Sequence, residues 1–170
     1  DQYAEILPNI FLIRVIEIVL FAVFVGHIVT ATVLWILNKQ ARQTTYEVNK
    51  PADNSSLFSR TMFLTGSIVY VFLVLHMRSF WYTSRFHHEQ NPSMYQLVRG
   101  VFSDPWYTVF YVVAMALLAF HLRHGFQSAF QTFGIKHLRY AQLIEATGAI
   151  FWLVIPAAFA FLPIYFFMHP

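Results

Sequence analysis

The sequence predicts an all-α protein, a multipass transmembrane helix bundle with four spans in this chain. The 170 residues are 58% hydrophobic and 11% charged, whereas soluble domains carry about a quarter charged residues. The mean hydropathy is +0.53. The charged residues are also segregated, which leaves four apolar stretches that are each long enough to cross a bilayer. We therefore expect residues 1–170 to form a single membrane domain.

Hydropathy and turn signals place the four spans in order. Polar connections containing Pro51 and Asn91-Pro92 separate the first three spans, and a short connection that begins at Gly134 precedes the last. Pro156 and Pro163 are expected to bend the last span. The predicted spans are residues 9–37, 61–82, 106–130 and 144–168.

Lysine and arginine in the connections set the expected orientation, because cytoplasmic loops carry an excess of these residues. They are denser in residues 38–60 and 131–143 than in the second connection or the opening segment. Loops 38–60 and 131–143 are therefore expected to be cytoplasmic, and Asp1 to start outside. An outside start without an initiating Met favours a further helix upstream that this sequence lacks.

The composition also narrows the possible chemistry. The chain has no cysteine, which excludes disulfides, thiolate-bound zinc, iron–sulfur clusters and covalently attached c-type haem. A metal would have to be bound by histidine, methionine or carboxylate. The net charge of +3 is interpreted as loop charge that orients the helices, and no basic run with interleaved aromatics predicts nucleic-acid binding.

Three histidines lie inside predicted spans, where a titratable residue is costly to bury and is therefore a functional candidate. His27 and His121 each precede the cytoplasmic end of their span by about ten residues, which places both at one depth. Two neutral imidazoles at one depth on different helices are typical of the axial ligands of a haem iron. His76 lies nearer the outside and predicts a second haem, whose other ligand belongs to the upstream helix.

Alternatives remain open at each of these positions. His124 follows His121 by one turn on the same face and could be the ligand in its place. Small residues near His27 and His121 leave room for a porphyrin, but they also permit close packing of membrane helices. A neutral imidazole hydrogen-bonded to a neighbouring helix is the other interpretation of each histidine.

The segment Phe120 to Gly134 follows the pattern F-H-L-x-H-G-x-x-S-x-x-x-x-x-G. It resembles the fourth membrane helix of the di-haem cytochrome b subunit of succinate dehydrogenases and fumarate reductases. The stretch from Ser59 through Thr65-Gly66 to His76 resembles the third helix of that family, and the stretch from Val15 to His27 resembles its second. The resemblance covers essentially the whole chain.

The resemblance implies five membrane helices in the family, of which the first has no counterpart here. It implies that His27 and His121 bind the haem b nearer the cytoplasm, and that His76 binds the outer haem b with a histidine of that first helix. It also implies an anchor in the bacterial cytoplasmic membrane that docks a flavoprotein subunit and an iron–sulfur subunit on the cytoplasmic side. Such an anchor passes electrons of the tricarboxylic acid cycle between the iron–sulfur subunit and a membrane quinone, usually menaquinone.

The sequence also offers candidate residues for the quinone site and for contacts with the haem propionates. A carboxylate near the outer surface could exchange quinol protons, which makes Glu5, Glu17 and Glu89 candidates, although each could be an interfacial charge. Arg78 is the preferred propionate partner, and it could instead extend toward the interface.

Other functions are compatible with the same residues. A cytochrome b anchor of a membrane hydrogenase or formate dehydrogenase also uses histidine-bound haem and would not need the additional helix. A small transporter could use its histidines as proton relays, and a cofactor-free anchor could use them to pair helices. The cytochrome b anchor would show haem absorption, whereas the transporter and the cofactor-free anchor would not.

Overall fold

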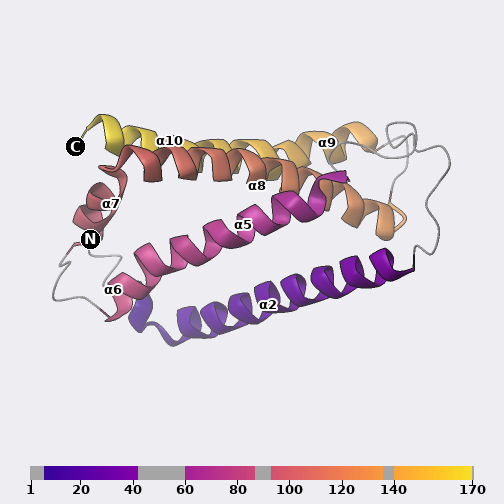
Figure 1. Ribbon diagram of the computed structural model, residues 1–170, viewed down its shortest axis with the longest axis horizontal. Coiled ribbons are helices and arrows are strands. Elements are labelled where there is room, and N and C mark those ends of the chain that lie inside the picture. Colours follow the sequence, from indigo (N-terminus) through magenta and orange to yellow (C-terminus); the bar gives the residue numbers. More distant parts are fainter. Residues whose placement is uncertain (1–5, 42–59, 87–92, 136–139, 170) are drawn as a thin grey trace. The chain divides into compact units, whose positions relative to one another are not determined.

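The computed structural model describes residues 6–41, 60–86, 93–135 and 140–169, and the regular elements in these ranges are all helical (Figure 1). The described ranges contain 4 helical segments that are long and apolar enough to cross a membrane. The prediction of an all-α protein with four spans is confirmed. The segments are Phe11–Gln40, Met62–Phe86, Pro105–Thr132 and Ala141–Met168.

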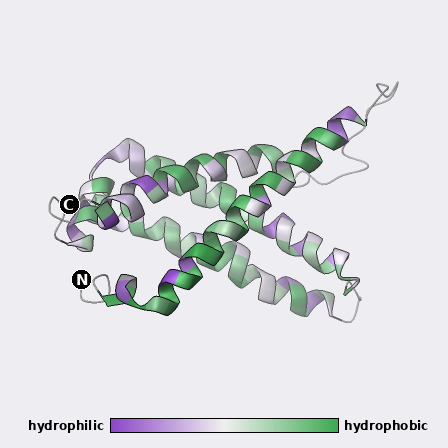
Figure 2. Cartoon of the chain, turned by 90° about the horizontal axis from the view of Figure 1, so that it is seen from below, coloured by the Kyte–Doolittle hydropathy of each residue, from purple (hydrophilic) through white to green (hydrophobic). Residues whose placement is uncertain are grey.

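The helices extend past several of the predicted span ends. The first reaches Gln40 and the second reaches Phe86, where the sequence has already become polar (Figure 2). Hydropathy falls at the membrane surface, but backbone hydrogen bonds still favour the helix there. At one such end the Lys39 ammonium lies 5.0 Å from the centre of the Trp35 ring, one turn earlier. A lysine can in this way extend from an apolar helix toward the interface.

The chain divides into two units, residues 1–53 and 54–170. The first unit contains the short helix η1 (Leu7–Asn9) and the long helix α2 (Phe11–Gln40). Within α2 the hydroxyls of Thr30 and Thr32 donate to the carbonyls one turn earlier, at 2.7 and 2.8 Å. These bonds satisfy the hydroxyls within the helix, as an apolar surrounding requires.

The second unit is built around α8 (Pro105–Thr132), which contacts both α5 (Met62–His76) and α10 (Ile155–Met168). The start of α8 is fixed by the Asp104 side chain, which accepts a hydrogen bond from the Trp106 amide at 2.8 Å. An aspartate N-cap followed by proline is a strong helix start signal. Helix α5 continues through η2 (Met77–Tyr82), a π-helical turn, into α6 (Thr83–Phe86).

The last span is interrupted by a π-helical segment. It consists of α9 (Ala141–Ala149), the π segment η3 (Ile150–Val154) and α10 (Ile155–Met168). Pro156 is the second residue of α10, two positions after the end of η3, and proline cannot donate to the carbonyl four residues before it. A wider turn ahead of the proline accommodates this lost hydrogen bond.

Helix α7 (Met94–Phe102) lies in a connection that the sequence analysis treated as a loop. Ser93 caps its start by accepting a hydrogen bond from the Gln96 amide at 3.4 Å. Leu97 and Phe102 are buried, and the Tyr95 ring lies 5.7 Å from that of Phe166 on α10. The signal was present, because a serine cap precedes apolar residues at helical spacing.

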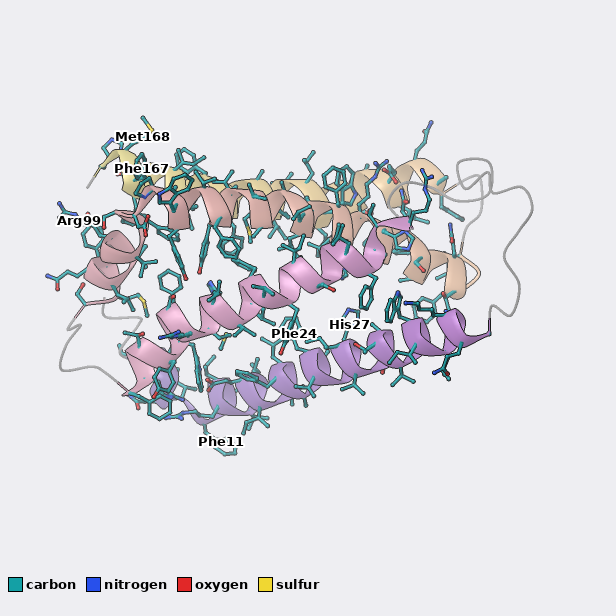
Figure 3. All side chains as sticks on the ribbon, in the orientation of Figure 1. Phe11, Phe24, His27, Arg99, Phe167 and Met168 are labelled. Carbon is teal, nitrogen blue, oxygen red and sulfur yellow. The ribbon has the colours of Figure 1, made fainter. Side chains whose placement is uncertain are left out.

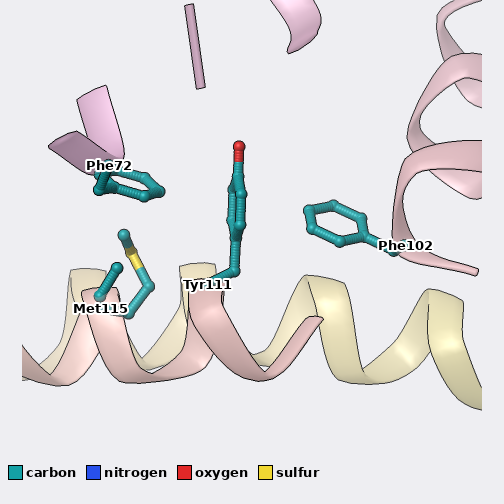
Figure 4. Close-up of a cluster of buried hydrophobic side chains, with 5 residues drawn as sticks. Phe72, Phe102, Tyr111 and Met115 are labelled. Atoms are coloured by element: carbon teal, nitrogen blue, oxygen red, sulfur yellow. The ribbon is translucent and has the colours of Figure 1, made fainter. Parts of the chain in front are cut away.

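The buried hydrophobic cluster of this unit lies between α5, α7 and α8. Tyr111 stands between Phe72 and Phe102, with ring centres 5.0 Å from each (Figure 4). Both contacts are edge-on, at interplanar angles of 77° and 81°, a geometry that aromatic pairs favour. The Tyr111 side chain is therefore held tightly on both sides. The cluster is Phe72, Phe102, Tyr111, Ala114 and Met115.

Candidate functional site

His76, the last residue of α5, lies against the aromatic cluster. Its ring centre is 5.6 Å from that of Phe72 and 5.2 Å from that of Phe80. Its Nδ1 atom lies 3.2 Å from the Tyr111 hydroxyl on α8. Among the described residues, no hydrogen bond occupies Nε2. One ring nitrogen is thus engaged by a phenol and the other is available to a ligand.

A second phenol, Tyr107, lies one turn before Tyr111 and interacts with it. The Tyr107 hydroxyl is 2.6 Å from the Ser79 hydroxyl and donates to the Leu75 carbonyl at 3.5 Å. Ser79 belongs to the π turn that begins directly after His76, and π turns rearrange the backbone hydrogen bonds of the helix in which they occur. The polar side chains near the end of α5 therefore come from α8 and from this turn.

His121 lies toward the other end of the α5 and α8 pair, next to Gly66. A Cβ atom added at Gly66 would be 3.1 Å from Cε1 of His121, which is tighter than an ordinary contact. The imidazole therefore packs closely against the α5 backbone, and a Cβ atom at position 66 would require it to shift by a few tenths of an ångström. This close approach gives Gly66 a physical role.

The two contacts between α5 and α8 fix how far apart these histidines are. His76 is level with Tyr111 and Gly66 is level with His121, so the helices run antiparallel. On each helix the two levels are separated by ten residues, which at the α-helical rise is about 15 Å. His76 and His121 therefore lie at different levels of this helix pair.

His124 is partly buried, like His121. The two residues are three positions apart on α8 and so lie on neighbouring parts of one face. No contact in the described part of the chain selects one of them as a ligand, and the preference for His121 stays a prediction. The same holds for Arg78, whose side chain is exposed in η2 beside His76.

His27 lies midway along α2, on the same side of that helix as Phe24 (Figure 3). His27 belongs to the first unit of the chain and His121 belongs to the second. The pairing of these two histidines therefore stays a prediction. Glu17 is on α2, ten residues before His27, whereas Glu5 and Glu89 lie outside the described residues.

A charged cluster that was not predicted from the sequence joins α8 to the last span. Glu145 on α9 accepts from the Arg123 guanidinium at 3.5 Å and from the Gln127 amide at 3.1 Å. The same guanidinium lies 5.0 Å from the centre of the Trp152 ring, a cation–π arrangement. The sequence did carry a signal for this pair, namely an arginine and a glutamate inside otherwise apolar spans. Charges in such positions are usually paired with each other.

Comparison with protein families, with characterised proteins and with solved structures finds no match to this chain. The fold alone defines the class, which is a helical protein that spans the membrane several times. Within the described residues, no three His, Asp or Glu side chains gather as a metal site. A haem iron needs only one imidazole on each face, so the function must be argued from the individual histidines.

Proposed function

We propose that this chain is the cytochrome b membrane-anchor subunit of a succinate:quinone oxidoreductase of the succinate dehydrogenase and fumarate reductase family. In this proposal it resides in the bacterial cytoplasmic membrane. His27 and His121 bind one haem b, and His76 binds a second haem b nearer the outside. The second ligand of the outer haem is the histidine that the family carries on its first helix.

The observation that supports this proposal best is the state of His76. An axial histidine coordinates iron through one ring nitrogen while the other donates a hydrogen bond. His76 has Nδ1 at 3.2 Å from a buried hydroxyl, and its Nε2 has no hydrogen-bond partner in the described part of the chain.

The environment of His121 also fits a haem ligand. Gly66 lets the imidazole approach the α5 backbone, so the ring is held by packing along its edge. A bound haem supplies reversible one-electron transfer through its iron. Two such sites about 15 Å apart along one helix pair would lie at different depths of the membrane.

The residues for partners and quinone follow from this orientation. The flavoprotein and iron–sulfur subunits would dock on the side of loops 38–60 and 131–143, close to the end of α8 that carries Arg123. Menaquinone would react near the opposite surface, where Glu5, Glu17 and Glu89 are the proton-exchanging candidates and Arg78 is the candidate for the haem propionates. No dicarboxylate or flavin chemistry is assigned to this chain.

A pyridine haemochrome assay on the complex purified from its native membrane tests the proposal. The expected result is two haem b per copy of this chain, with two low-spin bis-histidine signals in electron paramagnetic resonance. One haem per chain would contradict the di-haem assignment. An assembled complex without haem would overturn the cytochrome function and favour a histidine-relay transporter or a cofactor-free anchor.

A further inference from the structure

We infer that Tyr111 is a positioning residue for His76, and that its hydroxyl accepts the Nδ1 hydrogen so that Nε2 is directed to the iron. This inference rests on the proposed function, because it assumes that His76 is an axial ligand. It goes beyond that function by assigning a role to a phenol of α8. The role is to fix the tautomer and the ring orientation of the ligand.

The geometry of the pair supports this role. The two atoms are 3.2 Å apart, and the Tyr111 residue is 4% exposed. Phe72 and Phe102 hold the phenol ring edge-on from both sides at 5.0 Å (Figure 4). A hydroxyl on a ring that cannot swing away is a fixed partner, which a solvent-exposed side chain would not be.

The tautomer follows from the chemistry of the ligand. Nε2 can donate its lone pair to iron only if the ring proton is on Nδ1. A buried N–H then requires an acceptor, and in the described part of the chain the hydroxyl of Tyr111 is the group within reach. When the Tyr111 hydroxyl accepts this hydrogen, the imidazole becomes a stronger electron donor to the iron. A stronger donor stabilises ferric over ferrous iron.

Tyr107 provides a matched control on the same helix. It is one turn before Tyr111, and the two ring centres are 5.0 Å apart. Its hydroxyl bonds to Ser79 and to the Leu75 carbonyl instead of to His76. Tyr107 also interacts with the Tyr111 side chain, so removing its hydroxyl perturbs Tyr111 indirectly but keeps the acceptor of the Nδ1 hydrogen in place.

The test is a potentiometric titration of the haems, with electron paramagnetic resonance, on complexes carrying Tyr111→Phe or Tyr107→Phe. Tyr111→Phe should raise the midpoint potential of the outer haem and shift its low-spin signal, leaving the inner haem unchanged. If the hydrogen bond gives a tenfold preference for ferric iron, the rise is about 59 mV. Tyr107→Phe should shift the outer haem much less, because Tyr111 still accepts the Nδ1 hydrogen, and it should leave the inner haem unchanged.

A third variant, Tyr111→Gln, covers failure of the outer haem to bind in Tyr111→Phe. Its side-chain carbonyl can still accept the Nδ1 hydrogen, so haem retention and a potential nearer that of the unmodified complex are expected. An outer haem unaffected by Tyr111→Phe, or lost equally in both Tyr111 variants, would overturn the inference while the proposed function stands. An unmodified complex without an outer haem would instead refute the function.

Discussion

The two ends of the α5 and α8 pair hold their histidines in different ways. At one end His76 adjoins a cluster of aromatic rings, in which Tyr111 and Phe102 are each 4% exposed. At the other end His121 packs on Gly66, and the nearby Arg123 and Glu145 side chains are 33% and 47% exposed. The first end is closed by its own packing, and the second combines a close backbone contact with partly exposed charges.

The difference shows that similar residues in similar spans can be held by unlike interactions. Around His76 the stabilising contacts are ring against ring, and these do not depend on charge. At the His121 end, Arg123 and Gln127 of α8 contact Glu145 of α9 through an ion pair and an amide hydrogen bond, which contribute little where they are exposed. Substitutions at the aromatic end should therefore cost more stability than substitutions at the charged end.

The largest expected effect comes from the histidines themselves. Under the proposed function, His76→Ala should remove the haem of the aromatic end and retain the other, whereas His121→Ala should do the reverse, because each variant would lack one proposed axial ligand. His124→Ala should retain both haems. The measurement is the haem count per chain in the purified complex. Loss of the inner haem in His124→Ala but not in His121→Ala would reverse the ligand assignment.

The aromatic cluster can be tested by truncating one of its rings. Phe102→Ala should lower the free energy of unfolding by about 3–5 kcal/mol, because a buried ring leaves a cavity. Trp106→Ala is the control, since Trp106 is 82% exposed. Thermal unfolding of the purified protein in detergent compares them. Equal losses in the two variants would show that this cluster is not a core.

The contact of α8 with the last span has a steric limit. A Cβ atom at Gly148 would lie 2.6 Å from Cε1 of Phe126, so Gly148→Ala should destabilise the protein by about 1–3 kcal/mol. Gly125→Ala is the matched control, because nothing lies within 4 Å of a Cβ atom there. Unfolding midpoints of the two variants should differ accordingly. A neutral Gly148→Ala would mean that Phe126 moves aside freely.

The smallest effect is expected at the ion pair. Glu145→Gln should change the unfolding free energy by at most about 1 kcal/mol, because both partners are partly exposed. The glutamine can still accept from Gln127, so part of the contact remains. Unfolding midpoints at low and high salt provide the measurement. A loss as large as that of Phe102→Ala would remove the contrast between the two ends.

Much of the fold was predictable because a bilayer imposes a simple rule on sequence. Backbone groups in hydrocarbon must be paired within a helix, so long apolar stretches predict spans. The rule says less about short interfacial helices, and α7 was missed although Ser93 and its apolar spacing indicated it. It also says nothing about π turns, whose positions after His76 and before Pro156 depend on how the helices pack.

The candidate site was predictable only in part. Histidines inside spans stand out because burial of a titratable group is costly, and His27, His76 and His121 were found on that basis. Tyr111 was not found, because a tyrosine in an apolar helix has no distinctive spacing. Arg123 and Glu145 each carried a signal, but 22 residues separate them in the chain.

By itself the sequence determined the membrane class, the four spans and the histidines within them, because hydropathy and charge act locally along the chain. Only the tertiary structure decided that Tyr111 meets His76, that Gly66 meets His121 and that Glu145 meets Arg123. These contacts depend on the register between helices, which side-chain shape fixes across the interface. Composition and spacing along a single helix contain no information about that register.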